Sequence, residues 1–197
     1  MYLMIICPEG PCRGAIGFTD SGLGVSPAGG LPAPGPGFEF LELLPGRNVV
    51  ACRVGHPLLD ARPFPPAALL EYPWIAPPPG SPLIADLRAA LLALGATHVS
   101  VVYSGGSLSS LVNHLKASNS LTILPHSVIF TMRAANEITA IPLHLEHPPR
   151  ALAILRSGVS PASASASRFA EHVVSAFQRL RPAIAEHEQS VIWGFEE

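Results

Sequence analysis

Two turns made of small residues stand between strand-like and helix-like segments of this chain. The first leads from a β-rich run ending at Ala76 into Ser81 and Pro82, and the second is Ser104-Gly-Gly-Ser107. A strand that ends in such a turn and enters a helix presents backbone N–H groups that the helix itself cannot bond. Two such turns side by side would bind a small anionic ligand. The pattern therefore favours small-molecule binding and does not require catalysis.

Both turns also have a purely structural interpretation. Ser107 suits a helix N-cap, with Gly105 and Gly106 allowing the tight turn before it, and Ser81 suits the same role at the preceding helix. Asp86 adds a favourable charge near the start of that helix. The second turn lacks the lysine of a Walker phosphate loop and the spacing of a dinucleotide fingerprint. Helix capping and carboxylate binding both stay open for these residues.

Side-chain sets that support catalysis or metal binding are not evident. A serine hydrolase needs Gly-x-Ser-x-Gly after a strand, and no pair of carboxylates is placed for acid–base work. His144 and His147 fall on opposite faces of a strand without a nearby cysteine or third histidine, so we expect solvated loop histidines. His114 and His126 have no partner at a useful spacing, and His56 is expected to pack at a chain crossover. We therefore expect no enzyme activity, no metal and no cofactor.

The composition is that of a cytoplasmic protein without a nucleic-acid-binding surface. Lys and Arg total 12 against 14 Asp and Glu, which gives a net charge of -2, and Lys116 is the only lysine. Cys7, Cys12 and Cys52 are odd in number and dispersed, which favours free thiols in a reducing compartment. The apolar residues 1–7 are too few for a membrane span and lack the charged start of a signal peptide. We expect a cytoplasmic location and no membrane contact.

Strands alternate with helices along the 197 residues, which predicts an α/β fold with a mainly parallel sheet. Strands are expected near residues 15–18, 38–44, 48–54, 72–76, 99–103, 121–124, 138–143 and 150–155. Helices are expected near residues 82–94, 107–117, 127–132 and 166–180, with one helical turn near 65–70.

Four further expectations concern how these elements connect. The Pro45-Gly46 turn predicts a hairpin of its two flanking strands. The glycines and prolines of residues 19–37 predict an irregular loop. Pro182 is expected to end or kink the last helix. The strand at 150–155 is expected to pair with the strand at 48–54.

Four motifs occur in an order that resembles the effector-binding domain of LysR-type transcriptional regulators. They are Val-Val-Ala-Cys-Arg-Val-Gly-His-Pro-Leu at 49–58, Leu-Leu-Glu-Tyr-Pro-Trp-Ile at 69–75, Pro-Pro-Pro-Gly-Ser-Pro-Leu at 77–83 and Leu-Thr-Ile-Leu-Pro-His-Ser-Val at 121–128. Each motif is short, but the ordered set is specific. The resemblance extends over about residues 36–182.

The resemblance implies two α/β lobes of the type 2 periplasmic-binding-protein kind, with a small-molecule effector such as a carboxylate held between them. The chain would cross between lobes near Gly55 and near residues 148–149, which would form the hinge. The implied first lobe, second lobe and C-terminal tail are residues 1–55 with 149–182, 56–148 and 183–197. The implied effector contacts are Ser81, Pro82, Leu83, Ser104, Gly105, Gly106 and Ser107.

The sequence also departs from this family. The helix-turn-helix, the linker helix and the opening strand–helix–strand of the first lobe are not found, so we expect an incomplete first lobe. The usual Gly-x-Gly before the Leu-Pro strand is replaced by Ser118-Asn-Ser120. An unpaired sheet edge would remain, which residues 1–7 would cover within the chain or pair with across chains. We expect a homo-oligomer, or pairing with a full-length regulator.

Three other functions stay open on the same sequence. A cytoplasmic solute-binding protein would use the same fold and the same turns. A truncated interaction module would pair with an intact regulator through its open sheet edge. An enzyme on this fold would need a nucleophile or an acid–base set that the sequence does not display.

The charge distribution generates a prediction about DNA. With a net charge of -2 and no helix-turn-helix in the sequence, this chain alone should not bind duplex DNA specifically. A gel-shift titration over a range of salt concentrations tests this. Submicromolar, sequence-dependent affinity would contradict it.

Overall fold

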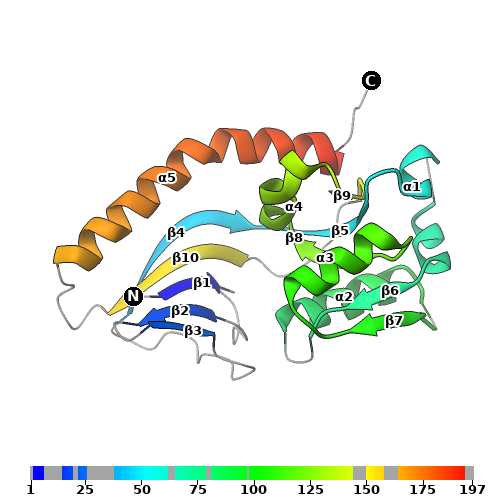
Figure 1. The fold of residues 1–197 in the computed structure, drawn as a ribbon, viewed down its shortest axis with the longest axis horizontal. Coiled ribbons are helices and arrows are strands. Elements are labelled where there is room, and N and C mark those ends of the chain that lie inside the picture. Colours follow the sequence, from blue (N-terminus) through cyan, green and yellow to red (C-terminus); the bar gives the residue numbers. More distant parts are fainter. Residues whose placement is uncertain are drawn as a thin grey trace. The chain divides into compact units, whose positions relative to one another are not determined.

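The computed structural model describes residues 2–6, 15–19, 22–25, 38–61, 65–78, 81–96, 98–143, 150–157 and 164–193 (Figure 1). Contacts within the chain divide it into two units. Unit 1 comprises Met1–Arg47 and Pro148–Ala185, and unit 2 comprises Asn48–His147 and Glu186–Glu197.

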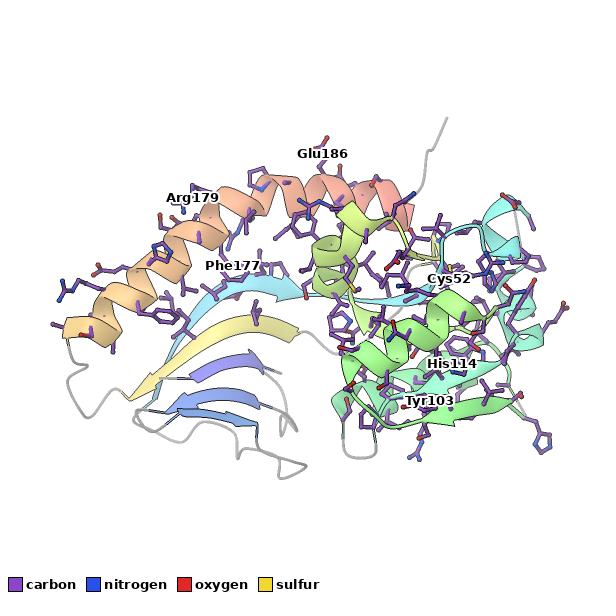
Figure 2. The ribbon with its side chains drawn as sticks, in the orientation of Figure 1. Cys52, Tyr103, His114, Phe177, Arg179 and Glu186 are labelled. Carbon is purple, nitrogen blue, oxygen red and sulfur yellow. The ribbon has the colours of Figure 1, made fainter. Side chains whose placement is uncertain are left out.

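Unit 1 contains an antiparallel sheet with the strand order β3-β2-β1-β10-β4. Its strands are β1 Tyr2–Ile6, β2 Ala15–Thr19, β3 Gly22–Val25, β4 Phe38–Gly46 and β10 Arg150–Ser157. The helix α5 (Ala164–Glu188) packs on this sheet, and Figure 2 shows Phe177 on the side of α5 that faces β4 and β10. Arg181 Nη2 also donates a hydrogen bond to the Leu43 carbonyl oxygen at 2.9 Å.

The strand pairings of unit 1 differ from those predicted. The strand at 150–155 forms as β10, but it pairs with β1 and β4, so its predicted pairing with residues 48–54 is wrong. The predicted hairpin is also wrong, because β4 and the strand after it belong to different sheets. Residues 22–25 of the predicted loop form β3, and the apolar segment 1–7 contributes β1, which pairs within the chain. The partner of a strand depends on distant residues, which local turn signals do not encode.

The last helix continues past its predicted end. Pro182 lies inside α5, which begins at Ala164 and ends at Glu188. Proline has no N–H to donate, so the carbonyl of Gln178 lacks the hydrogen bond that an uninterrupted helix would supply. A π-helical turn, η3 (Gln189–Trp193), follows directly. Most of the predicted tail is therefore helical, and residues 194–197 lie outside the described residues.

Unit 2 contains two short sheets that meet at Trp74. One has the order β8-β5-β9 and is antiparallel, and the other is the parallel pair β6-β7. A parallel bridge between Trp74 and Leu121 joins them, with the Ile75 N–H donating to the Leu121 carbonyl at 2.8 Å. The strands are β5 Asn48–Arg53, β6 Trp74–Ala76, β7 Val101–Ser104, β8 Thr122–Pro125 and β9 Ile138–Ala140.

Helices cover both faces of these strands. They are α1 Pro57–Asp60, η1 Pro66–Glu71, α2 Pro82–Ala93, α3 Leu108–Ala117, α4 His126–Met132 and η2 Arg133–Ala135. On one face, α2 packs with Val50 and Cys52 of β5 and with Trp74, whose Nε1 donates to the Leu69 carbonyl oxygen at 3.1 Å. On the other face, α3 and α4 pack with Val49 and Ala51 of β5.

The elements predicted for unit 2 are confirmed, but the predicted mainly parallel sheet is wrong. Among the described residues, the parallel pairings are β6 with β7 and the Trp74–Leu121 bridge. The predicted first lobe, residues 1–55 with 149–182, included the strand at 48–54, whereas β5 pairs with β8 and β9 of unit 2. Burial explains the difference, because Val49, Val50, Ala51 and Cys52 are all fully buried and need a strand position covered on both faces. The two-lobed organisation with an effector between the lobes stays a prediction.

His56 connects α1 with the segment before β8. The fully buried ring accepts a hydrogen bond at Nδ1 from the Leu58 N–H (3.2 Å), and its Nε2 lies 3.2 Å from the Asn119 carbonyl oxygen. This arrangement fits a neutral imidazole that donates through Nε2. Burial lowers the pKa of His56, the hydrogen bond to Asn119 raises it, and Arg53 lowers it further, with a net downward shift.

This environment predicts that unit 2 loses stability as the pH falls below about 6.5, the ordinary histidine pKa. Unfolded chains then bind a proton that folded His56 resists, so the free energy of unfolding decreases. Urea titrations followed by tryptophan fluorescence at several pH values measure this dependence. The slope of the free energy of unfolding against pH should become smaller in His56→Gln. It should stay unchanged in His98→Gln, since His98 is exposed. Equal slopes in the parent and in His56→Gln would contradict the assignment.

Candidate functional site

The carboxyl ends of β6 and β7 lie at the same edge of their sheet. The two strands are parallel, with Ile75 opposite Tyr103 and Ala76 opposite Ser104. The Gly105 N–H donates to the Ala76 carbonyl oxygen at 3.3 Å, which extends the pairing one residue beyond β7. Both predicted turns therefore follow neighbouring strands at one edge.

The helices that follow these two strands cover opposite faces of the sheet. Helix α2, which follows β6, packs in the same hydrophobic cluster as Trp74, whereas α3, which follows β7, packs in the cluster that contains Ile75. Neighbouring residues of a strand point to opposite faces. The starts of α2 and α3 therefore lie beyond the carboxyl ends of two neighbouring strands, which is the side of open α/β sheets that generally binds ligands.

The first turn is a complete helix cap. The Ser81 hydroxyl oxygen accepts from the Leu83 N–H at 3.2 Å, and the Ser81 carbonyl oxygen accepts from the Ile84 N–H at 3.1 Å. Pro82, the first residue of α2, has no N–H. The expectation of free amides at the start of α2 is therefore wrong, since proline and the serine cap account for them. What this turn offers a ligand is the proton of the half-buried Ser81 hydroxyl.

The second turn keeps backbone donors for a ligand. The Ser107 hydroxyl oxygen accepts from the Ser110 N–H at 3.1 Å and lies 3.0 Å from the Ser110 hydroxyl. The amides of Leu108 and Ser109 precede the first amide that the helix can bond to itself, and among the described residues none supplies an acceptor to them. Ser107 and Gly106 are exposed, so solvent and small molecules reach these donors.

The backbone of the second turn requires both glycines. Gly105 and Gly106 have φ values of 87° and 79°, in the region that favours glycine. A Cβ added at Gly105 meets open space, whereas one added at Gly106 would collide with the Tyr103 hydroxyl. The tyrosine side chain thus lies directly against the turn.

Tyr103 and His114 form a ring stack next to this turn that the sequence interpretation missed. Their centroids are 5.5 Å apart with an angle of 14° between the ring planes, and Figure 2 shows both side chains together. The prediction that His114 has no partner is wrong. Tyr103 is the next-to-last residue of β7 and His114 lies two helical turns beyond Ser107, and this spacing alone does not show that the rings meet.

Other polar residues singled out from the sequence lie elsewhere. Asp86 does not add charge at the turn: it is buried and accepts a hydrogen bond from Asn48 Nδ2 at 2.6 Å. His126 has a partner after all, since its Nε2 lies 2.9 Å from Nδ1 of His187. His144 and His147 lie outside the described residues. Within the described part of the chain, no group of three His, Cys, Asp or Glu side chains is placed to hold a metal ion.

The charges and thiols of unit 2 do not add a reactive group to the turns. Lys116 forms an ion pair with Glu137 at 2.7 Å, so its ammonium group is engaged on α3. Burial raises the pKa of the free Cys52 thiol to about 12, despite the nearby Arg53, which keeps it protonated and unreactive. Cys7 and Cys12 lie outside the described residues. None of the helices in the described segments is both long and apolar enough to cross a membrane.

Comparisons with known proteins identify the same fold in transcriptional regulators. The CcmR regulatory domain of Synechocystis PCC6803 in complex with 2-PG has 18% identity and a TM-score of 0.60, covering 75% of this chain and 71% of that chain. The effector binding domain of QuiR in complex with shikimate has 14% identity and a TM-score of 0.55, with coverages of 76% and 69%. The reduced OxyR regulatory domain of Pseudomonas aeruginosa has 16% identity and a TM-score of 0.54, with coverages of 76% and 70%. No curated protein matches the chain.

The structural similarity shows the fold, and the family follows from the sequence. The profile of the LysR substrate binding domain matches residues 20–178, which is most of the chain. This range includes both turns and all of the strands of unit 2. The chain belongs to the family of LysR substrate-binding domains, the effector-binding regulatory domains of LysR-type transcriptional regulators.

Proposed function

We propose that this regulatory domain senses a small carboxylate or similar anion at the carboxyl ends of β6 and β7. The observation that supports the proposal is the shared carboxyl edge, where parallel neighbouring strands lead to α2 and α3 on opposite faces of the sheet. The residues assigned to the effector contact are Ser81, Pro82, Leu83, Ser104, Gly105, Gly106 and Ser107.

The second turn supplies most of the hydrogen bonds in this proposal. The amides of Leu108 and Ser109 and the Ser107 hydroxyl are donors at the start of α3, where the helix dipole contributes a partial positive charge of about 0.5. An anion placed there is stabilised without a basic side chain. The first turn adds the Ser81 hydroxyl, since its backbone donors are already engaged.

Weak binding and recognition by shape follow from the same geometry. Charge-assisted hydrogen bonds from Arg or Lys strengthen carboxylate sites, and the lysine on α3 is already paired with Glu137. The Tyr103 hydroxyl next to Gly106 offers a polar contact for a second group of the ligand. Shikimate, found with QuiR, is a hydroxylated carboxylate of the class that such a site would accept.

The remaining aspects of the function rest on family membership. The domain acts without catalysis, in the cytoplasm, as part of an assembly in which a LysR-type DNA-binding segment reads the promoter. Its assembly is a homo-oligomer or a pairing with a full-length regulator. Within the described residues, the one cysteine is a buried, protonated thiol, in keeping with a binding role.

A titration with small carboxylates, shikimate included, tests the ligand class. Melting temperatures and calorimetry should detect binding of at least one carboxylate. Glycerol, which carries no charge, should show no binding. Ser107→Ala should weaken that binding by about 3- to 10-fold, the effect of one lost hydrogen bond. It should also lower the free energy of unfolding by about 1 kcal/mol because the α3 cap is lost.

Ser81→Ala is the matched control for this experiment. It removes the same kind of cap from α2, where no backbone donor stands free for a ligand. Its stability loss should be similar, and its loss of affinity should be smaller, because Ser107→Ala removes a hydroxyl donor and also loosens the helix start that carries the amides of Leu108 and Ser109. Equal affinity losses in the two variants, or no carboxylate bound by the parent, would contradict the proposed site.

Alanine substitutions at the two glycines separate backbone strain from the position of Tyr103. Each should destabilise the protein by about 1–2 kcal/mol because of its positive φ. Gly106→Ala should weaken carboxylate binding further than Gly105→Ala, since only its Cβ displaces the Tyr103 hydroxyl. Urea unfolding and calorimetry measure the two effects. Equal affinities in the two variants would show that Tyr103 makes no contribution.

A further inference from the structure

The end of the last helix is attached to unit 2 by a small set of contacts. Residues 186–193 comprise the last residues of α5 and the π-helical turn η3, and they are grouped with unit 2. Val191 of η3 packs, partly buried, against the hydrophobic cluster that contains Ile129 and Ile138. We call residues 186–193 the C-terminal segment. A polar contact of this segment joins His187 to His126 on α4.

The two imidazole rings form a direct hydrogen bond. Nε2 of His126 and Nδ1 of His187 are 2.9 Å apart, and the ring centroids are 5.1 Å apart with an angle of 43° between the planes. His126 is buried at the start of α4, and His187 is half-buried. His187 also packs edge-on against the Phe130 ring, with centroids 5.6 Å apart. Both rings are thereby held in a fixed relation.

A hydrogen bond of this kind exists only while at least one of the facing nitrogens is unprotonated. One ring donates its N–H and the other accepts through its lone pair, so the pair carries at most one extra proton. If both rings are protonated, two N–H groups face each other and two positive charges lie within hydrogen-bonding distance. The contact then becomes repulsive.

The charged groups around the pair make the second proton more unfavourable. Arg133, in η2, places its guanidinium carbon 3.7 Å from the Phe130 ring centroid and donates to the Phe130 carbonyl oxygen at 2.6 Å. Burial lowers the pKa of His187, and the charge of Arg133 lowers it further.

The neighbouring segments carry acidic residues on α5 and before β9. Glu186 and Glu188 flank His187 in sequence, and Figure 2 shows Glu186 pointing away from α4. Glu137, before β9, is paired with Lys116 of α3 at 2.7 Å. The strand β9 itself, Ile138–Ala140, carries no charged side chain. Arg133 places its positive charge over the Phe130 ring, against which His187 packs.

We propose that the His126–His187 pair is a protonation-sensitive latch that fastens the C-terminal segment to α4 and β9. Above about pH 6.5, the ordinary histidine pKa, at least one ring is neutral and the segment is fastened. As the pH falls below that value, the released segment binds a proton that the fastened one resists. The equilibrium then shifts toward release. Val191 packs partly buried against unit 2 at either pH, so the His126–His187 bond is the contact through which protonation acts.

Hydrogen–deuterium exchange on the full chain tests the latch. Peptides that cover residues 186–193 are compared at about pH 7.5 and about pH 5, with labelling times scaled for the intrinsic pH dependence of amide exchange. The parent should lose protection in this segment by about tenfold or more at the lower pH, while peptides from β5 and β8 lose less. Unchanged protection, or loss in step with β5 and β8, would overturn the proposal.

Variants that keep a hydrogen bond but do not titrate make the test specific. Gln places its amide where Nε2 of His126 lies, and Asn places its amide where Nδ1 of His187 lies. His126→Gln with His187→Asn should therefore show less than about twofold change between the two pH values. His187→Asn alone should give the same reduced response if the double variant does not fold. His172→Asn, an exposed site on α5, should behave as the parent, and a full pH response in either latch variant would overturn the proposal.

Discussion

Burial of β5 on both of its faces is the constraint on which unit 2 depends. Val49 and Ala51 point into one hydrophobic cluster, and Val50 and Cys52 point into the other. A strand that is apolar on both sides must have helices on both sides. The helices that meet this demand are α2 on one face and α3 with α4 on the other. Because α2 and α3 follow neighbouring parallel strands, the same packing places the two turns at one edge of the sheet.

The positions of helices and strands were predictable because short stretches of sequence determine them. The helix near 107–117 follows from a serine cap and an apolar stripe, and it appears as α3. Which strands pair with each other was not predictable in this way. The run Asn48–Arg53 reads equally well as half of a hairpin or as a central strand, and only the burial of both faces distinguishes the two. The helix end predicted at Pro182 is wrong for a related reason. Packing and hydrogen bonds elsewhere retain the helix although proline lacks the N–H donor.

The candidate site was predictable in outline but not in its chemistry. Serine and glycine at the two turns indicated helix starts, and both serines are caps. The turns differ at two positions: Pro82 has no N–H and the Leu83 N–H is bonded to Ser81, whereas the amides of Leu108 and Ser109 stay available at α3. The ring stack of Tyr103 on His114 and the bond between His126 and His187 join residues from different elements. Contacts of this kind depend on the tertiary fold, so spacing along the chain does not reveal them.

The indole of Trp74 gives the protein an internal optical reporter. The ring is fully buried in the centre of unit 2, and its N–H is bonded to the Leu69 carbonyl rather than to water. An indole in such surroundings emits at shorter wavelength than one in solvent. Trp74 also begins β6, two residues before the strand ends at the edge that carries the turns. In a variant that lacks Trp193, light emission from Trp74 therefore reports whether the scaffold beneath the two turns is intact, without any attached dye.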